Sequence, residues 1–203
     1  MEQSKLHVFP LQKIISGGQT GADRGGLEAA EALGIETGGT VPLGFWTTDG
    51  KCPELGTRFK LKELSLERNT KIPISAMYIE RSKKNVDEGD ATVAFRLHSS
   101  IGTDKTIGYC LSKSWKVIDD FRTYTKTPYR PLLVIDELSE TKKKENIAKI
   151  QTFIYQHNVK TLNVCGHRES KETGYGNFTV TVRKLLVNAI LTCLDDSLSN
   201  VDP

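Results

Sequence analysis

Two patterns of apolar and polar positions alternate along this chain. Short β-branched runs predict buried strands at Lys13–Ser16, Ala91–Phe95, Leu132–Ile135 and Thr161–Cys165, with Lys116–Ile118 as a weaker candidate. Apolar residues recur at helical spacing in Asp23–Leu33, Ser75–Asp87, Thr141–His157 and Phe178–Leu194. Strands that alternate with helices indicate a parallel sheet covered on both faces. The predicted fold class is α/β, a doubly wound, mostly parallel sheet with helices on both faces.

No linker or internal repeat interrupts this pattern, so residues 1–203 are expected to form a single domain. Residues 1–10 and 196–203 are expected to be flexible ends. Residues 38–64 differ from the rest because they combine many glycines and two prolines with little periodicity. We predict an irregular excursion from the sheet there, and such stretches are usually functional or poorly ordered.

Charge and cysteine usage exclude several classes of protein. The 28 basic and 25 acidic residues give a net charge of +3, which is too small to indicate a nucleic-acid or membrane partner. The N-terminus lacks the apolar core of a signal peptide, and no apolar run is long enough to span a bilayer. The four cysteines lack metal-binding spacing and are interpreted as reduced thiols. We therefore expect a cytoplasmic protein without a metal site.

The junction after the first predicted strand, "SGGQTGAD", combines glycines with small polar residues. Glycine lets a ligand approach the backbone, and the free N–H groups and dipole of the following helix favour an anion such as phosphate. The spacing matches neither a P-loop nor a dinucleotide fingerprint, so a tight turn without a ligand is the competing interpretation. Asp23 also has a second interpretation, as a helix cap. The candidate phosphate ligands are Ser16, Gly17, Gly18, Gln19, Thr20, Gly21 and Asp23.

Two further junctions have the same character, "RLHSSIGTDKTIGYC" after Phe95 and "GHRESKETGYGNF" after Cys165. All three junctions follow predicted parallel strands, so we expect them to meet at one edge of the sheet. Three small, polar loops that converge suit a nucleotide-like ligand, and Arg168 or Lys171 would supply positive charge. The candidates from these two loops are Gly102, Thr103, Gly166, Arg168, Glu169 and Ser170.

The segments "ISGGQTGADRGGLEAAEALGI", "GGTVPLG" and "LNVCGHRESKETG" resemble the putative molybdenum carrier family, the circularly permuted YpsA-like branch of the SLOG superfamily. In "ERSKKNVDEGDATVAF", the family's middle signature is matched by Arg81, Asn85, Val86, Asp87 and Asp90. The resemblance extends from about residue 14 to residue 176. It implies a Rossmann-like fold, a homo-oligomer, and a ligand site in the three loops, to which Arg81 and Asn85 are added as candidates.

The converging loops and the resemblance together leave four functional hypotheses. The first is binding of a phosphate-bearing nucleotide or nucleotide-derived small molecule, as sensor or carrier. The second is phosphoribohydrolase-like cleavage of the N-glycosidic bond of a nucleoside monophosphate, so enzymatic activity is left open. The third is a molybdenum cofactor carrier, because the pterin of that cofactor carries a phosphate. The fourth is a structural subunit with a vestigial site, which the long glycine-bearing loops disfavour because glycine costs conformational entropy on folding.

The hydrolase hypothesis requires a carboxylate near the sugar. Related hydrolases have a glutamate at the position of Thr106, which leaves Asp104 and Glu169 as candidate catalytic residues. Each has an alternative interpretation, Asp104 as a helix cap and Glu169 as an ion-pair partner of Arg168. His98 and His167 are interpreted as hydrogen-bonded surface residues.

Overall fold

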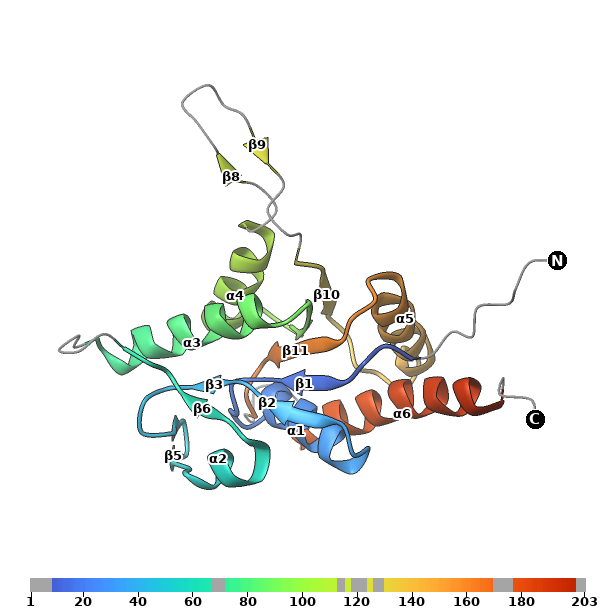
Figure 1. Ribbon diagram of the computed structural model, residues 1–203, viewed down its shortest axis with the longest axis horizontal. Helices are drawn as coiled ribbons and strands as arrows, with labels where there is room; N and C mark the ends of the chain where they lie inside the picture. Colours follow the sequence, from blue (N-terminus) through green and yellow to red (C-terminus); the bar gives the residue numbers. More distant parts are fainter. Residues whose placement is uncertain are drawn as a thin grey trace.

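The computed structural model describes residues 9–66, 72–112, 116–117, 124–125, 130–169 and 177–199, with only the backbone described for 116–117, 124–125 and 195–199. Its centre is a five-stranded sheet in which neighbouring strands are parallel (Figure 1). In spatial order the strands are β10 (Leu132–Ile135), β7 (Ala91–Phe95), β11 (Thr161–Gly166), β1 (Lys13–Ile15) and β2 (Glu36–Gly38). The predicted α/β class and the parallel sheet are therefore confirmed.

Helices cover the sheet in two groups. The first group contains α1 (Ala22–Ala32), α5 (Lys143–Gln156) and α6 (Phe178–Ser199), and α6 packs against the other two. The second group contains α3 (Ile74–Glu88) and α4 (Ile101–Ser112), which pack against each other on the other side of the sheet (Figure 1). The main apolar cluster joins the sheet strands to α1, α5 and α6.

Helix α1 lies unusually close to its neighbours because it carries two adjacent glycines. A Cβ atom on Gly26 would lie 2.7 Å from the Cβ atom of Val164 in β11. A Cβ atom on Gly25 would lie 2.7 Å from the carbonyl oxygen of Thr179 in α6. Both helical faces are therefore packed against backbone or β-branched side chains, and α1 is held between the sheet and α6.

Residues 38–64 are more ordered than the sequence predicted. Strand β3 (Thr40–Val41) pairs in parallel with β6 (Lys62–Glu63), and β4 (Trp46–Thr47) pairs in antiparallel fashion with β5 (Gly50–Lys51). Helix α2 (Glu54–Phe59) follows β5. A second apolar cluster orders the segment, formed by Leu27, Val41, Leu55, Phe59 and Leu61. These residues do leave the main sheet, but they are not irregular as predicted. The prediction failed because strands of two residues and a helix of six are too short to give a periodic sequence pattern.

The chain ends also differ from the predicted boundaries. Phe9 is buried, and its ring packs edge-on against that of Tyr155 at 5.4 Å, so the ordered chain starts before residue 10. Helix α6 continues to Ser199, whereas flexibility was expected from residue 196. Residues 1–8 and 200–203 lie outside the described part of the chain.

The weaker predicted strand, Lys116–Ile118, lies outside the main sheet. Residues 116 and 117 form β8 (Lys116–Val117), which pairs with β9 (Tyr124–Thr125) in a separate two-stranded ladder. Strand β2, at the edge of the main sheet, was not predicted. None of the helices in the described ranges is long and apolar enough to cross a membrane.

Candidate ligand-binding site

A pocket of about 690 Å³ lies where the three loops meet at the carboxyl ends of β1, β7 and β11. Gln19 lines it from the first loop, the stretch from His98 to Ser100 from the second, and the stretch from Gly166 to Arg168 from the third. Tyr78 and Arg81 of α3 form a further wall. The predicted convergence of the loops is therefore confirmed, and the volume falls within the range of small-molecule sites.

The position of this pocket follows from the winding of the sheet. Strands β1 and β11 lead into α1 and α6 in one helical layer, whereas β7 leads into α4 in the other. The connections therefore diverge between β11 and β7, which are neighbours in the sheet. In doubly wound folds, a crevice opens at such a reversal, outside the carboxyl ends of the strands.

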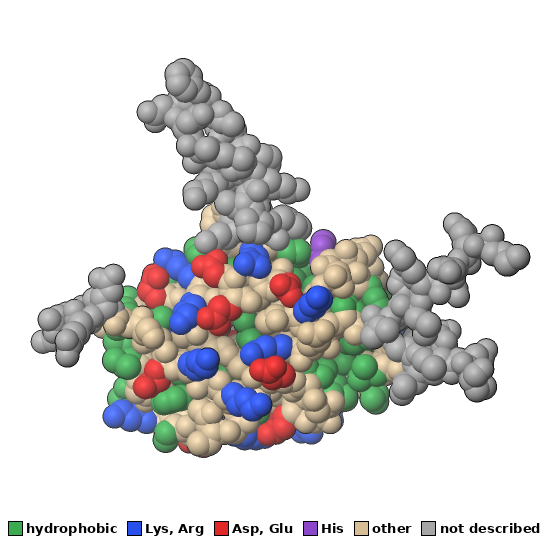
Figure 2. All heavy atoms as spheres, in the orientation of Figure 1, with side chains coloured by type: hydrophobic (Ala, Val, Ile, Leu, Met, Phe, Trp, Pro, Cys, Tyr) green, Lys and Arg blue, Asp and Glu red, His purple; other side chains and the backbone are tan. Residues whose placement is uncertain are grey.

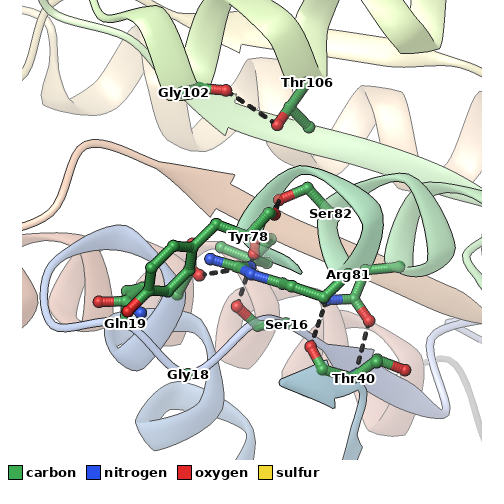
Figure 3. A network of polar contacts seen from close by, with 12 residues as sticks. Ser16, Gly18, Gln19, Thr40, Tyr78, Arg81, Ser82, Gly102 and Thr106 are labelled. Carbon is green, nitrogen blue, oxygen red and sulfur yellow. Dashed lines mark hydrogen bonds and ion pairs between the residues drawn. The ribbon is translucent and has the colours of Figure 1, made fainter. Parts of the chain in front are cut away.

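Asp23 and Arg81 form a buried ion pair at this edge of the sheet. The Nη1 atom of Arg81 lies 3.0 Å from Oδ2 of Asp23, and the side chains are 8% and 5% exposed, respectively. The Asp23 carboxylate also accepts hydrogen bonds from the backbone of Gln19 and Gly17. Burial raises the pKa of Asp23, against the lowering effects of Arg81 and of these hydrogen bonds. Figure 3 shows Arg81 reaching from α3 toward the loop that carries Gly18.

The predicted capping role of Asp23 is wrong in its detail. Helix α1 begins after Gly21, and no side chain caps it. Asp23 lies within the first helical turn and folds back onto the amides of the preceding loop. The carboxylate therefore orders the loop rather than the helix end.

The loop glycines contact other parts of the protein. A Cβ atom on Gly17 would lie 1.3 Å from the guanidinium of Arg81. Gly18 has φ +73° and faces the second apolar cluster. Gly21 has φ +97°, and a Cβ atom added to it would lie 2.3 Å from the carbonyl oxygen of His167. Small residues are therefore needed here for close packing of the chain.

In the second loop, Asp104 is fully engaged with its surroundings. Its carboxylate lies 2.5 Å from Nε of Arg96 and accepts hydrogen bonds from the Ser99 hydroxyl at 3.2 Å and the Ser100 amide at 3.1 Å. The hydrogen bond from Arg96 lowers the pKa of Asp104. Asp104 lies within the first turn of α4 and accepts from the amide of Ser100, the residue before the helix, so the predicted capping role is wrong in its detail, as it is for Asp23.

Gly102 and Thr106 lie one helical turn apart in α4. The Thr106 hydroxyl donates to the Gly102 carbonyl at 3.1 Å, so Thr106 returns its hydrogen bond to the helix backbone. A Cβ atom on Gly102 would have no neighbour within 4 Å, and Gly102 lines the pocket. Thr106, which stands where the sequence resemblance places a glutamate in related hydrolases, therefore has its hydroxyl hydrogen-bonded within its own helix.

In the third loop, Glu169 caps α6. Its carboxylate accepts hydrogen bonds from the amides of Phe178 and Thr179 at 3.0 and 3.3 Å, and from the Thr179 hydroxyl. The predicted ion pair with Arg168 is absent among the described residues, so that interpretation is wrong. Arg168 is instead exposed and lines the pocket.

His98 and His167 form a stacked pair on the pocket wall. Their ring centroids are 4.0 Å apart, and the His98 amide donates to Nε2 of His167 at 3.2 Å. His167 is only 4% exposed, which corrects its predicted surface position. Burial, with His98 nearby, lowers the pKa of His167. A neutral His167 is therefore the form that this arrangement favours.

The described lining of the pocket is rich in positive charge. It contains four cations, Arg81, Lys83, Lys105 and Arg168, and one carboxylate, Asp23. No ion pair joins Lys105 or Arg168 to another described residue, whereas Arg81 pairs with Asp23 and Lys83 with Glu80. The lining therefore favours an anionic ligand. Within the described ranges, no three His, Cys, Asp or Glu side chains are grouped as metal ligands.

Sequence comparison identifies the family. The sequence model of the circularly permutated YpsA SLOG family matches residues 14–187, a span that contains all three loops and the whole main sheet except Lys13, the first residue of β1. The chain belongs to this family. Comparison with curated proteins gives no significant match.

A solved structure supports the same assignment for this circularly permutated YpsA SLOG protein. The crystal structure of a putative molybdenum carrier protein from Syntrophus aciditrophicus SB superposes with a TM-score of 0.66. The two chains are 26% identical, and the match covers 88% of this chain and 96% of the other. The shared architecture is thus a Rossmann-like fold over nearly the full length of the neighbour.

The structure divides the sequence-predicted site residues into two groups. Those that line the pocket are Gln19, Asp23, Arg81, Gly102, Thr103, Gly166 and Arg168. Those that are described but do not line it are Ser16, Gly17, Gly18, Thr20, Gly21, Asn85, Asp104 and Glu169. Ser170 lies outside the described residues.

Two residues of the second group have clear structural roles. The Asn85 side chain accepts from the Thr40 amide at 2.7 Å and donates to the Thr40 carbonyl at 3.1 Å, which joins α3 to β3. The Ser16 hydroxyl donates to the Val164 carbonyl at 2.8 Å, which joins β1 to β11. Both polar groups are therefore occupied by the backbone.

Sequence reasoning missed several lining residues. These are Thr48, Tyr78, Ile79, Ser82, Lys83, His98, Ser99, Ser100, Lys105, Thr106, Cys165 and His167. Two α3 members had a usable signal, since Tyr78 lies three residues before Arg81 and four before Ser82, which is helical spacing. Thr48 had none, because Gln19 holds it from 29 residues away through the Thr48 amide and hydroxyl.

Proposed function

We propose that this protein binds a nucleotide or a nucleotide-derived small molecule in the pocket at the carboxyl edge of the sheet, as a sensor or carrier. The observation that carries the proposal is a pocket of about 690 Å³ that the three loops share, in which the described lining residues include four cations and one carboxylate. A volume of this size accommodates a mononucleotide, and the charge excess selects a ligand with an anionic group.

A molybdenum cofactor is the second ligand to be considered, because the solved neighbour is named as a putative molybdenum carrier protein. The described residues fit the phosphate of its pterin, which Lys105 and Arg168 would hold. They offer no group of metal ligands, so contact with the protein would be through the organic part. When bound, the cofactor supplies the metal, and the chain supplies charge and enclosure.

The hydrolase hypothesis gains no support from the geometry. Asp104 and Glu169 accept several hydrogen bonds each, and both hold the start of a helix. Asp23 is bound to Arg81. None of these three carboxylates is free to assist cleavage of a glycosidic bond without breaking contacts that order the loops.

Calorimetry with a matched pair of glycine variants tests the proposed function. Gly102 and Gly108 are both in α4, and a Cβ atom on either would have no neighbour within 4 Å, but only Gly102 lines the pocket. Gly102→Leu fills the pocket, whereas Gly108→Leu makes the same change elsewhere on the helix. The panel contains AMP, cyclic AMP, ADP-ribose and adenosine, with thermal unfolding of both variants as the control for folding.

The expected result is binding of at least one phosphorylated compound to the native protein and to Gly108→Leu, with a loss of about tenfold or more in Gly102→Leu. Failure of the native protein to bind any anionic compound at millimolar concentration contradicts the proposal.

Metal analysis and fluorescence of protein purified from a host that makes molybdenum cofactor test the second ligand, because retained molybdenum with a pterin signal identifies the cofactor.

A further inference from the structure

The first loop, which is the glycine-rich loop of residues 16–21, already binds an anionic group of the protein itself, the Asp23 carboxylate. The Asp23 carboxylate accepts hydrogen bonds from the backbone of Gly17 and Gln19 and lies 3.0 Å from the Arg81 guanidinium. This carboxylate is 4% exposed. A ligand phosphate that entered the loop would have to displace it and leave a buried carboxylate without these partners, which is unfavourable.

Two amides at the start of α1 are also occupied by protein atoms. The Gly21 amide donates to the Thr179 hydroxyl at 2.8 Å, and the Ala22 amide donates to the His167 carbonyl at 2.9 Å. These two donors are among those that would otherwise receive an anion. Neither Gly21 nor Ala22 lines the pocket, nor do Gly17 and Gly18.

The available positive charge comes from other elements. Lys105 is in the second turn of α4, and Arg168 is in the loop after β11. Both line the pocket, and neither has an ion pair with a described residue. The charge of Arg81, by contrast, is balanced by Asp23 at 3.0 Å, so Arg81 adds little net attraction for an anion.

We infer that Lys105 and Arg168 form the anion subsite of the pocket, and that the phosphate of the ligand binds there instead of in the glycine-rich loop. This inference rests on the proposed function and adds the orientation of the ligand within the pocket. The class of ligand is a phosphomonoester with an organic body. The body is directed toward α3, where Tyr78 provides an aromatic wall. The glycine-rich loop serves as the internal support of the site.

The experiment compares charge deletions in the folded protein. AMP, adenosine and inorganic phosphate are titrated by calorimetry into the native chain and into Lys105→Ala, Arg168→Ala, Arg168→Lys and Lys144→Ala. Lys144 is the matched control, because it is an exposed lysine in α5 that does not line the pocket. Lys105 and Arg168 are at the pocket surface, so their replacement is not expected to prevent folding, and thermal unfolding checks this.

We expect Lys105→Ala and Arg168→Ala each to lower the affinity for AMP by about tenfold, since each removes one charged contact. Arg168→Lys keeps most of the affinity, and Lys144→Ala keeps all of it. Adenosine affinity is expected to change by less than about twofold, because adenosine has no phosphate. Native-like AMP affinity in both alanine variants would overturn the inference and leave the proposed function intact. Absence of AMP and phosphate binding by the native chain would contradict the inference, and absence of binding to every anionic compound of the wider panel would contradict the proposed function as well.

Discussion

The ion pair between Asp23 and Arg81 is the most buried one between described residues. Its side chains are 8% and 5% exposed, whereas Lys149 and Glu145 of an exposed pair on α5 are 46% and 45% exposed. Arg81 spans from α3 to the first loop, and Asp23 receives the backbone hydrogen bonds of that loop. The positions of α1, α3 and the first loop therefore depend on this one ion pair.

Removal of Asp23 is expected to be costly for this reason. Asp23→Ala leaves the Arg81 guanidinium buried without its counter-charge, and we expect the free energy of unfolding to fall by about 3–5 kcal/mol. Lys149→Ala is the control, with an expected loss below about 1 kcal/mol because its ion pair is solvated. Urea unfolding monitored by circular dichroism measures both. Similar losses in the two variants would contradict a structural role for the buried pair.

His167 predicts a pH dependence of stability. Burial lowers its pKa in the folded state below the ordinary value of 6.5. As pH falls through 6.5, the unfolded chain binds a proton at this residue while the folded chain does not, so the free energy of unfolding decreases. At higher pH both states are neutral, and the effect vanishes.

Urea unfolding at about pH 7.5 and about pH 5.5 tests this linkage. The native protein is expected to lose more stability over this interval than His167→Gln, which cannot be protonated. Equal losses in the two proteins would show that His167 titrates normally in the folded state.

At the scale of elements, glycine is tightly packed in α1 and open to space in α4. Gly26 of α1 faces β11, where a Cβ atom would lie 2.7 Å from the Cβ atom of Val164. Gly108 of α4 is surrounded by open space. The same substitution should therefore have opposite signs in the two helices.

We expect Gly108→Ala to raise the free energy of unfolding by up to about 1 kcal/mol, because alanine favours a helix over glycine. Gly26→Ala is expected to lower it by about 1–3 kcal/mol, since α1 must move away from the sheet. Thermal and urea unfolding of the two variants measure the difference. A stabilising Gly26→Ala would show that α1 is not held tightly against β11.

The main strands could be predicted because their pattern is local. Ala91–Phe95 and Leu132–Ile135 are apolar runs whose predicted ends agree with β7 and β10. Strand β2 and the two-residue strands of residues 38–64 were not predictable in this way, since each exists through pairing with a distant strand. The helical ends were predicted to within a few residues, with α6 extending furthest beyond its predicted end.

The candidate site was predictable at the level of loops and only partly at the level of side chains. The parallel sheet brings the three junctions to one edge, which the alternation of strands and helices implied. Asn85 was assigned to the ligand from the family resemblance and Ser16 from its place in the first loop. Their actual backbone partners, Thr40 and Val164, are too distant in sequence to be predicted. The His98–His167 pair was missed for the same reason, since its members are separated by 69 positions in sequence.

At the scale of the whole molecule, the pocket joins parts of the chain that are far apart in sequence. The last strand, β11, lies in the middle of the sheet between β1 and β7, so residues near 19, 100 and 167 become neighbours. Figure 2 shows basic and acidic side chains interspersed over one face of the molecule, without a large area of one sign. The charge that matters for binding is therefore expected to be that of the pocket lining.

Assembly into a homo-oligomer stays a prediction from the family resemblance. Sedimentation velocity tests it directly in solution. A sedimenting mass that is a multiple of the chain mass is expected, and a stable species with the mass of one chain at micromolar concentration would contradict it.

The most direct test of the account is an amide NMR titration of the isotope-labelled protein with AMP. If the three loops form one ligand site, the amides of Gln19, Gly102 and Gly166 shift together and saturate with one dissociation constant, since each loop lines the same pocket. Shifts confined to the separate hollow beside Asp90 and Lys160, or no saturable shifts at any loop, would contradict the shared site.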